Sequence, residues 1–472
     1  MRRHPSRLAF LFLSLFLSAG FPTVSGAQQP DTLRLRAADA IRLALEVSPE
    51  VDAVQSAVEY AEARRRLAGA SRFATDFSVQ TAHAVAPGLR NLPDDVPSDE
   101  LYLYPDVRND WENIRPFNRI ETNLIQPLLT WGEIGGSLDA ARHGVDVERA
   151  SVAQKENEVA LRTGTVYYGL LLARQLSRLT DQARDVVDQA RNEIERLLEE
   201  GAEDVDDADL FQVRITEQEF NRRVVEVEQR LMTVRTALRR QLMLPRSSVV
   251  VAEELVLEPI PFVLDSLDAY FDLALTHRPD LDRATAGLAA REALVRVARS
   301  DYYPKLFLGI ESRITLTEGR FRQPNPYVSD PYRGRSLRAG LGLRLPLNIA
   351  QTRARVEQAE AERNEVRHQL TAARELVLFE VEEAYRNVIT ARAAMQAQEE
   401  ALTISREWLR TEQINFDLDL GDTENLVDAV RASLELEASY YEQVRAYNVA
   451  VLTLLTRTGV LRDRARRGRI VD

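Results

Sequence analysis

The 472-residue sequence contains no cysteine. This excludes disulfides, thiolate metal sites and a lipidated cysteine behind an export signal. Histidine is scarce as well, and none of the five residues belongs to a metal-binding pair such as His-Glu-x-x-His: His4, His83, His143, His277 and His368. A Gly-x-Ser-x-Gly elbow, a phosphate-binding glycine loop and a dinucleotide fingerprint are also missing. We therefore expect a chain that is not an enzyme and that uses no cofactor and no metal.

Long hydrophobic runs are missing after residue 27, where no stretch approaches the roughly 18 apolar residues of a transmembrane helix. Residues 1–27 combine a basic start, an apolar run from Leu8 to Ala19, and small residues at the −3 and −1 positions of a cleavage site, Ser25 and Ala27. This pattern predicts a secretory signal peptide over residues 1–27. An N-terminal membrane anchor is the rival interpretation, but it would need an apolar run of about 20 residues.

The chain has 73 acidic and 61 basic residues, a formal net charge of −12. Removing the signal takes away three arginines, so 58 basic residues remain and the net charge becomes −15. This balance argues against nucleic acid as a partner. An exported chain without a transmembrane helix is periplasmic, secreted or a β-barrel.

The sequence contains an internal repeat. Residues 43–52 and 273–282 both read Leu-Ala-Leu-x-x-x-Pro-(acid)-(apolar)-Asp. No Gly/Ser/Pro-rich linker separates the copies, which favours one composite domain. We expect two repeats, residues 28–250 and 251–472, each with an amphipathic helix, two strands and a long helical hairpin.

Four segments alternate with the period of two that is typical of strands, at about residues 73–85, 117–128, 305–317 and 335–347. One face of each segment is mostly apolar. The opposite faces carry six charged residues that fit either a hydrated barrel lumen or the solvent face of a soluble sheet: Arg119, Glu121, Glu311, Arg313, Arg338 and Arg344. The strands have about the 9–11 residues that cross a bilayer, and aromatic residues flank them. Four strands cannot close a barrel, so a membrane location requires several chains to share one, and three chains would supply twelve strands.

Two segments without proline, from Ile134 to about Glu200 and from Ile349 to about Asp417, predict very long helices. At 1.5 Å per residue each helix would be on the order of 100 Å long. Each reverses near a glycine, Gly201 or Gly421, and forms a hairpin, over about residues 132–244 and 349–458. Such lengths are typical of a coiled coil or a helical tube.

With these parts in order, the mature sequence resembles the TolC-like outer-membrane efflux proteins over almost its whole length. Beyond the repeated openings, the resemblance rests on the strand-to-helix junctions Gln126–Gly132 and Leu343–Asn348, the tyrosine motifs Thr165–Tyr168 and Glu383–Tyr385, and the turn Gly421–Leu426.

The resemblance implies a mixed, mainly α fold. Three chains would share a twelve-stranded β-barrel in the lipid of the outer membrane, continuous with a periplasmic α-helical tunnel. Family members are passive exit ducts of tripartite efflux pumps or type I secretion systems, where they dock on a periplasmic adaptor and an inner-membrane transporter. The alternatives are a periplasmic adaptor or a coiled-coil scaffold. An adaptor usually has one hairpin and often a lipidated cysteine, whereas this chain has two hairpins and no cysteine.

Acidic residues gather at the two expected hairpin turns. Under the resemblance they would lie at the periplasmic pore entrance, although polar turns are also simply solvated: Asp417, Asp419, Asp422, Glu203, Asp204, Asp206 and Asp207. At an entrance they would favour cations.

Overall fold

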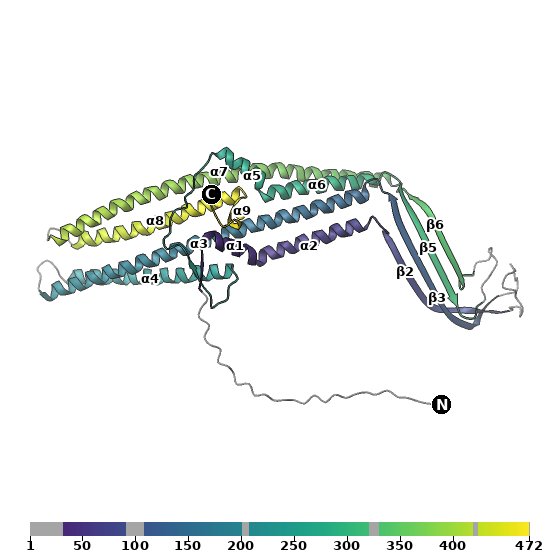
Figure 1. The fold of residues 1–472 in the computed structure, drawn as a ribbon, viewed down its shortest axis with the longest axis horizontal. Coiled ribbons are helices and arrows are strands. Elements are labelled where there is room, and N and C mark those ends of the chain that lie inside the picture. Colours follow the sequence, from purple (N-terminus) through teal and green to yellow (C-terminus); the bar gives the residue numbers. More distant parts are fainter. Residues whose placement is uncertain (1–31, 91–107, 201–206, 321–329, 419–422, 472) are drawn as a thin grey trace, which may run out of the picture.

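A computed structural model describes residues 32–90, 108–200, 207–320, 330–418 and 423–471. The predicted signal peptide lies outside these ranges. Long helices run side by side as an elongated body, and a β-sheet extends from one end of it at an angle (Figure 1). The described helices include none that is long and apolar enough to cross a membrane.

The order of elements repeats along the chain. After the short strand β1 (Thr32–Leu35), the first series is α1 (Ala37–Val47), α2 (Pro49–Ala70), β2 (Asp76–Arg90), β3 (Arg108–Leu129), α3 (Glu133–Glu200) and α4 (Asp207–Gln241). After β4 (Val249–Ala252), the second series is α5 (Leu267–His277), α6 (Pro279–Ser300), β5 (Lys305–Thr317), β6 (Gly334–Arg344), α7 (Ile349–Asp417) and α8 (Thr423–Arg457). A short helix, α9 (Leu461–Arg466), follows.

The opening segment of each series is two helices, not the single helix that we expected. The break falls at Ser48 and Arg278, whose backbones are extended (ψ 115° and 117°) because each precedes a proline. Pro49 and Pro279 then begin the second helix, where a missing N–H costs nothing. The repeated proline of the two openings therefore marks a corner between two helices.

The four long strands form one antiparallel sheet in the order β2-β3-β5-β6. The observed β5 covers the expected residues 305–317, whereas β2 and β3 extend beyond the expected ends into residues 87–90 and 108–116. The expectation that the first two strands end at 85 and begin at 117 was therefore wrong at this end of the sheet. Pro87 lies on the edge strand, and Pro116 lies just beyond Phe117, where pairing with β5 ends; at neither place is an N–H needed by a further strand.

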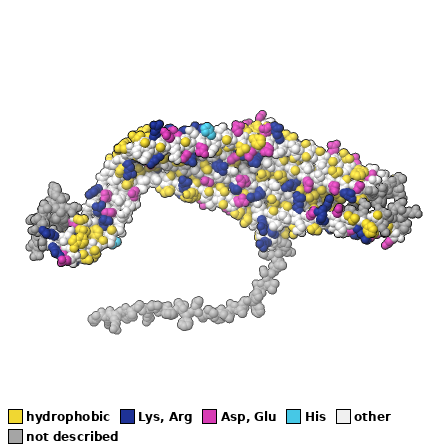
Figure 2. All heavy atoms as spheres, turned by 180° about the vertical axis from the view of Figure 1, so that it is seen from behind, with side chains coloured by type: hydrophobic (Ala, Val, Ile, Leu, Met, Phe, Trp, Pro, Cys, Tyr) yellow, Lys and Arg dark blue, Asp and Glu magenta, His cyan; other side chains and the backbone are white. Residues whose placement is uncertain are grey.

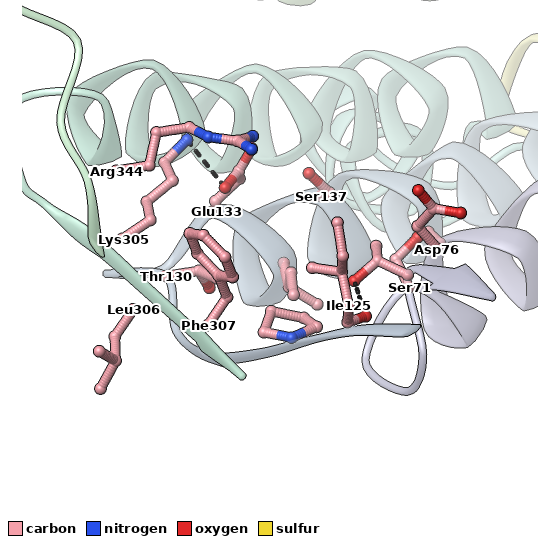
Figure 3. Close-up of a pocket in the computed structure, with 14 residues that line it drawn as sticks. Ser71, Asp76, Ile125, Thr130, Glu133, Ser137, Lys305, Leu306, Phe307 and Arg344 are labelled. Atoms are coloured by element: carbon pink, nitrogen blue, oxygen red, sulfur yellow. Dashed lines mark hydrogen bonds and ion pairs between the residues drawn. The ribbon is translucent and has the colours of Figure 1, made fainter. Parts of the chain in front are cut away.

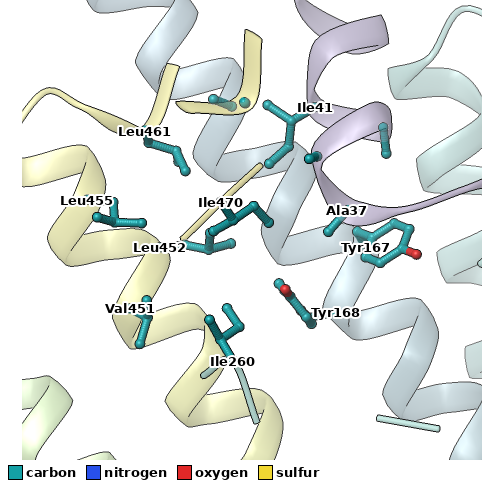
Figure 4. Packing of buried hydrophobic residues seen from close by; sticks show 14 of the residues in the cluster. Ala37, Ile41, Tyr167, Tyr168, Ile260, Val451, Leu452, Leu455, Leu461 and Ile470 are labelled. Carbon is teal, nitrogen blue, oxygen red and sulfur yellow. The ribbon is translucent and has the colours of Figure 1, made fainter. Parts of the chain in front are cut away.

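The hydrophobic core lies midway along the helical body. It joins α1, α3, α8, α9 and the segment after β4, with Ile41, Tyr167, Leu452, Leu455 and Leu461 fully buried (Figure 4). On α7, the buried residues Val377, Val381, Ala384 and Val388 follow the expected three- and four-residue spacing. The strands β1 and β4 pair in parallel beside this core and tie the two series together.

Candidate channel surfaces

The sheet has two unlike faces. Pairing places Phe77, Val79, Leu337, Leu341 and Leu343 on one of them, and their exposed fractions range from 57% to 75%. Large apolar side chains this exposed lack a covering layer within the chain. The face therefore needs a partner or an apolar solvent.

The other face carries all six predicted charged residues, and four of them meet in one network. Arg313 Nε lies 2.6 Å from Glu121 Oε1, Arg119 Nε lies 3.7 Å from the same oxygen, and Arg313 Nη2 lies 3.3 Å from Glu311 Oε1. Arg338 is the register partner of Glu311. Arg344 lies apart, at the base of β6, with its guanidinium 5.5 Å from the centre of the Phe307 ring. The six predicted residues are four arginines and two glutamates, so together they give this face a slight excess of positive charge.

Aromatic residues mark both ends of the sheet. At the helical end, Trp131 stacks on Tyr303 at 5.1 Å and donates its indole N–H to the Pro304 carbonyl at 2.8 Å. These contacts hold Trp131 in a left-handed conformation (φ 50°), where the chain turns from β3 into α3. At the far end, Tyr332 contacts Trp111 and Phe117 edge-on. Tyr102, Tyr104 and Tyr327, which we also expected to flank the strands, lie outside the described residues.

Arg320 holds the far ends of the two strand pairs together, which the sequence did not reveal. Its buried guanidinium pairs with Asp330 at 2.7 Å and donates to the Pro87 carbonyl at 2.6 Å and to Asn109 Oδ1 at 2.8 Å. The guanidinium also lies over the ring of Tyr332, 4.9 Å from its centre. The bonds to Pro87 and Asn109 link the β2–β3 pair of the first series to the chain after β5, and Asp330 and Tyr332 hold the guanidinium from its own side.

A cavity of about 540 Å³ lies where the sheet meets the helices (Figure 3). Its floor comes from the strand bases, with Ile125 and Phe307, and Ser71 and Ser137 line it from the helical side. Two of its lining charges belong to an internal network, because Lys305 Nζ binds Glu133 at 2.8 Å and Asp301 at 2.7 Å. The other two, Asp76 and Arg344, form no ion pair with a described residue.

The acid of each repeated opening takes part in an ion pair that fixes the helical corner. In the first series, Glu50 binds Arg162 of α3 at 2.6 Å, and this hydrogen bond lowers the pKa of the Glu50 carboxyl. In the second series, Arg278 holds Asp280 through two bonds of 2.9 and 2.6 Å and reaches Glu380 of α7 at 2.8 Å. Arg457 of α8 also approaches Glu380, at 3.2 Å.

In this second cluster burial disfavours the charged forms of Arg278 and Asp280, but their ion-pair partners favour the charged forms more strongly. Burial lowers the pKa of Arg278, yet its bonds to Asp280 and Glu380 leave that pKa above the usual range. Burial likewise raises the pKa of Asp280, and the guanidinium of Arg278 brings it below its usual value. The cluster therefore stays ionised and connects the start of α6 to α7 and α8.

The tyrosine motif on α3 is part of the core. The Tyr167 hydroxyl lies within hydrogen-bond distance of the Leu35 carbonyl, at 2.7 Å, and of the Glu254 carboxylate. Tyr168 is buried beside it, in edge-on contact at 5.9 Å. Burial raises the pKa of both phenols, so both are neutral at physiological pH, and Tyr167 is the hydrogen-bond donor of the two.

Two of the predicted entrance acids are described, and both lie at the hairpin ends farthest from the sheet. Asp207 begins α4 and Asp417 ends α7. The remaining five, Glu203, Asp204, Asp206, Asp419 and Asp422, lie outside the described residues. Along the helical body, basic and acidic side chains are interspersed (Figure 2), and many form ion pairs within or between helices. Within the described ranges, no group of three His, Asp or Glu residues is arranged to hold a metal ion.

Comparisons with known proteins agree with this architecture. Residues 271–460 match the family model of the outer membrane efflux proteins. Among curated proteins, no sequence matches significantly. Among solved structures, VceC from Vibrio cholerae is similar at a TM-score of 0.70 and 16% identity, over 90% of this chain and 96% of that one. The open state of MtrE from Neisseria gonorrhoeae has a TM-score of 0.70 at 15% identity, over 90% and 89% of the two chains. CmeC from Campylobacter jejuni has a TM-score of 0.69 at 15% identity, over 90% and 85%.

The fold is therefore that of outer-membrane efflux channels, mainly helical with a four-stranded antiparallel sheet, as expected from the sequence. The predicted resemblance to TolC-like proteins is confirmed by the family match over residues 271–460 and by the shared fold of the solved structures. MtrE and CmeC are outer membrane channels, and VceC is an outer membrane protein.

Proposed function

We propose that this chain is one subunit of a homotrimeric outer-membrane channel, the passive exit duct of a tripartite efflux pump or a type I secretion system. The observation that carries the proposal is the sheet, with one exposed apolar face, one charged face and two unpaired edge strands. In water such a sheet would expose both edges and a broad apolar surface. In a bilayer the apolar face is solvated, provided that the edges are closed by further copies.

Three copies of the sheet supply twelve strands, which is within the range of outer-membrane barrels. The charged face then lines a hydrated lumen, with Arg119, Glu121, Glu311, Arg313, Arg338 and Arg344 exposed to the passing cargo. The aromatic residues at both ends of the sheet lie at the two membrane interfaces, which such side chains favour.

The two series of elements correspond to the repeats 28–250 and 251–472, behind a signal peptide of residues 1–27. In each, the long helix of 68 or 69 residues spans on the order of 100 Å, which is enough to project deep into the periplasm. The hairpin acids then surround the periplasmic entrance, where a docked adaptor and an inner-membrane transporter deliver the cargo. The chain itself catalyses no reaction and binds no nucleic acid.

The decisive experiment is the detergent-corrected mass of mature protein extracted from outer membranes, measured by light scattering after size exclusion. Three chains per particle, together with ion conductance after reconstitution into planar bilayers, are expected. A monomer that remains soluble without detergent would contradict the proposal and favour a periplasmic adaptor or scaffold.

A further inference from the structure

Asp76 and Arg344, the charged residues of this cavity that form no ion pair with a described residue, lie on opposite edges of the sheet. Asp76 begins β2, Arg344 ends β6, and two strands separate them. At about 4.8 Å per strand spacing, they are roughly 14 Å apart across the sheet of one chain. They cannot therefore form an ion pair with each other within a subunit.

Both side chains are on the charged face. The register connects Asp76 to Ile125, Ile125 to Gly309, and Gly309 to Gly340. Arg344 lies four residues after Gly340 on the same strand and therefore points to the same side. Asp76 is the single acidic residue of β2, and Arg344 and Arg338 are the basic residues that β6 presents on this face.

Barrel closure determines how these two edges meet. Strands in outer-membrane barrels tilt by about 35–45°, so each strand is shifted against its neighbour by roughly 1.0–1.5 residues, given a rise of about 3.3 Å. Four strands accumulate a shift of about four to six residues. The shift has to be even, because an odd one would turn the charged face of one subunit toward the lipid.

Only one direction of shift keeps β6 of one subunit paired with β2 of the next. The opposite direction would place β6 beside α2. A shift of four residues sets Arg344 of one subunit opposite Asp76 of the next. A shift of six sets it opposite Ser78, with Asp76 diagonal to it and about 7 Å away, within reach of an arginine. In both cases all 11 residues of β6 find partners on the 15-residue β2.

We propose that Arg344 and Asp76 of adjacent subunits form the ion pair that closes the barrel and sets its register at each of the three seams. This inference rests on the proposed trimer and adds the residues that determine its assembly. In one subunit the Phe307 ring already holds the guanidinium of Arg344 at the base of the strand, 5.5 Å from the ring centre. The partner that fits this edge is a second copy of the same chain.

Cysteine pairs test the register directly, because the natural chain has no cysteine and gives no background. Oxidation of D76C/R344C or of S78C/R344C should produce covalent dimers and trimers in denaturing gels, since a disulfide requires Cα atoms within about 7 Å. The pair D76C/G340C represents closure without a shift and should not cross-link. Cross-linking of D76C/G340C, or of none of the three pairs in a trimeric protein, would overturn the proposal.

Charge exchange tests the ion pair itself. Each exposed pair is worth a factor of about 1.5 to 5, so three seams should change the yield of trimer roughly threefold to a hundredfold. D76R and R344D should each lower the trimer fraction, and the double variant D76R/R344D should recover it. If the trimer fraction of the double variant is no higher than that of the single variant with the lower fraction, the ion pair is refuted. A wild-type protein that is not trimeric would refute the proposed function itself.

Discussion

Replacing Arg278 with methionine should destabilise the subunit more than any comparable change at the surface. Methionine keeps much of the side-chain length but removes a guanidinium that is 10% exposed and that neutralises two carboxylates of 25% and 20% exposure. Loss of one partner from a buried ion pair costs about 3–5 kcal/mol, and residual solvent access here reduces this to roughly 2–4 kcal/mol. Arg457 remains near Glu380 and limits the loss at that carboxylate.

The loss of stability caused by Arg278→Met should depend on pH in a defined direction. In the native protein the pKa of Asp280 is lowered, so its contribution to stability is present above the unfolded value of about 4 and is lost as the pH falls through the lower folded value. Without Arg278, burial dominates and raises the pKa of Asp280. The difference in free energy of unfolding between the two proteins should therefore be largest near neutral pH and smaller near pH ~4.

The assay is urea unfolding followed by far-ultraviolet circular dichroism in detergent, at one fixed protein concentration because assembly contributes to stability. The matched control is Arg291→Met, which also removes a bond from α6 to α7, the 2.6 Å contact with Glu362, but between side chains exposed by 42% and 38%. That loss should be at most about 1 kcal/mol. Equal effects of the two variants, or a penalty for Arg278→Met that does not change with pH, would refute the reasoning.

Four further predictions concern the core, the backbone and the channel surfaces. Tyr167→Phe should cost about 1–2 kcal/mol because two partly buried acceptors lose their donor, while Tyr168→Phe, whose hydroxyl has no protein partner among the described residues, should be nearly neutral in the same urea titration. Gly459→Ala should lower the thermal midpoint well beyond Gly468→Ala: both glycines have positive φ, 78° and 76°, but only at Gly459 would a Cβ overlap the His277 carbonyl. Glu121→Gln should shift the reversal potential of the reconstituted channel toward anions, since it removes the carboxylate that Arg119 and Arg313 share and leaves Glu311 as the only paired acid of the network; an unchanged potential would remove Glu121 from the lumen. Neutralising Asp417 and Asp419 should weaken cation selectivity or block by divalent cations, and unchanged behaviour would place both residues away from the entrance.

Much of the architecture could be predicted because it is encoded locally. The absence of proline and the regular apolar spacing predicted α7 over 349–417, and alternation predicted β5 over 305–317, as observed. Both patterns depend only on neighbours along the chain. The repeated openings likewise predicted two similar halves, although the proline in each was not recognised as the start of a second helix.

Strand ends were less predictable, because proline interrupts a strand only where a neighbouring strand needs the N–H that proline lacks. Pro87 and Pro116 lie within strands, and whether a strand tolerates them depends on which strand lies beside it. The sequence also placed six charged residues on one face of the sheet correctly, since alternation assigns faces. It did not reveal that Arg119, Glu121, Arg313 and Glu311 form one network while Arg344 stands apart.

By itself the sequence determined where the long helices and the four strands lie, which face of each strand is charged, and that no stretch after residue 27 has the length and apolar character of a transmembrane helix. These properties follow from periodicity and composition. Tertiary structure alone decided the partners of the charges: Arg278 meets Glu380 and the Arg457 carbonyl across 102 and 179 residues, and Arg320 reaches Pro87 across 233. The physical reason is that burial and pairing depend on which elements pack side by side, and a local pattern carries no information about distant neighbours.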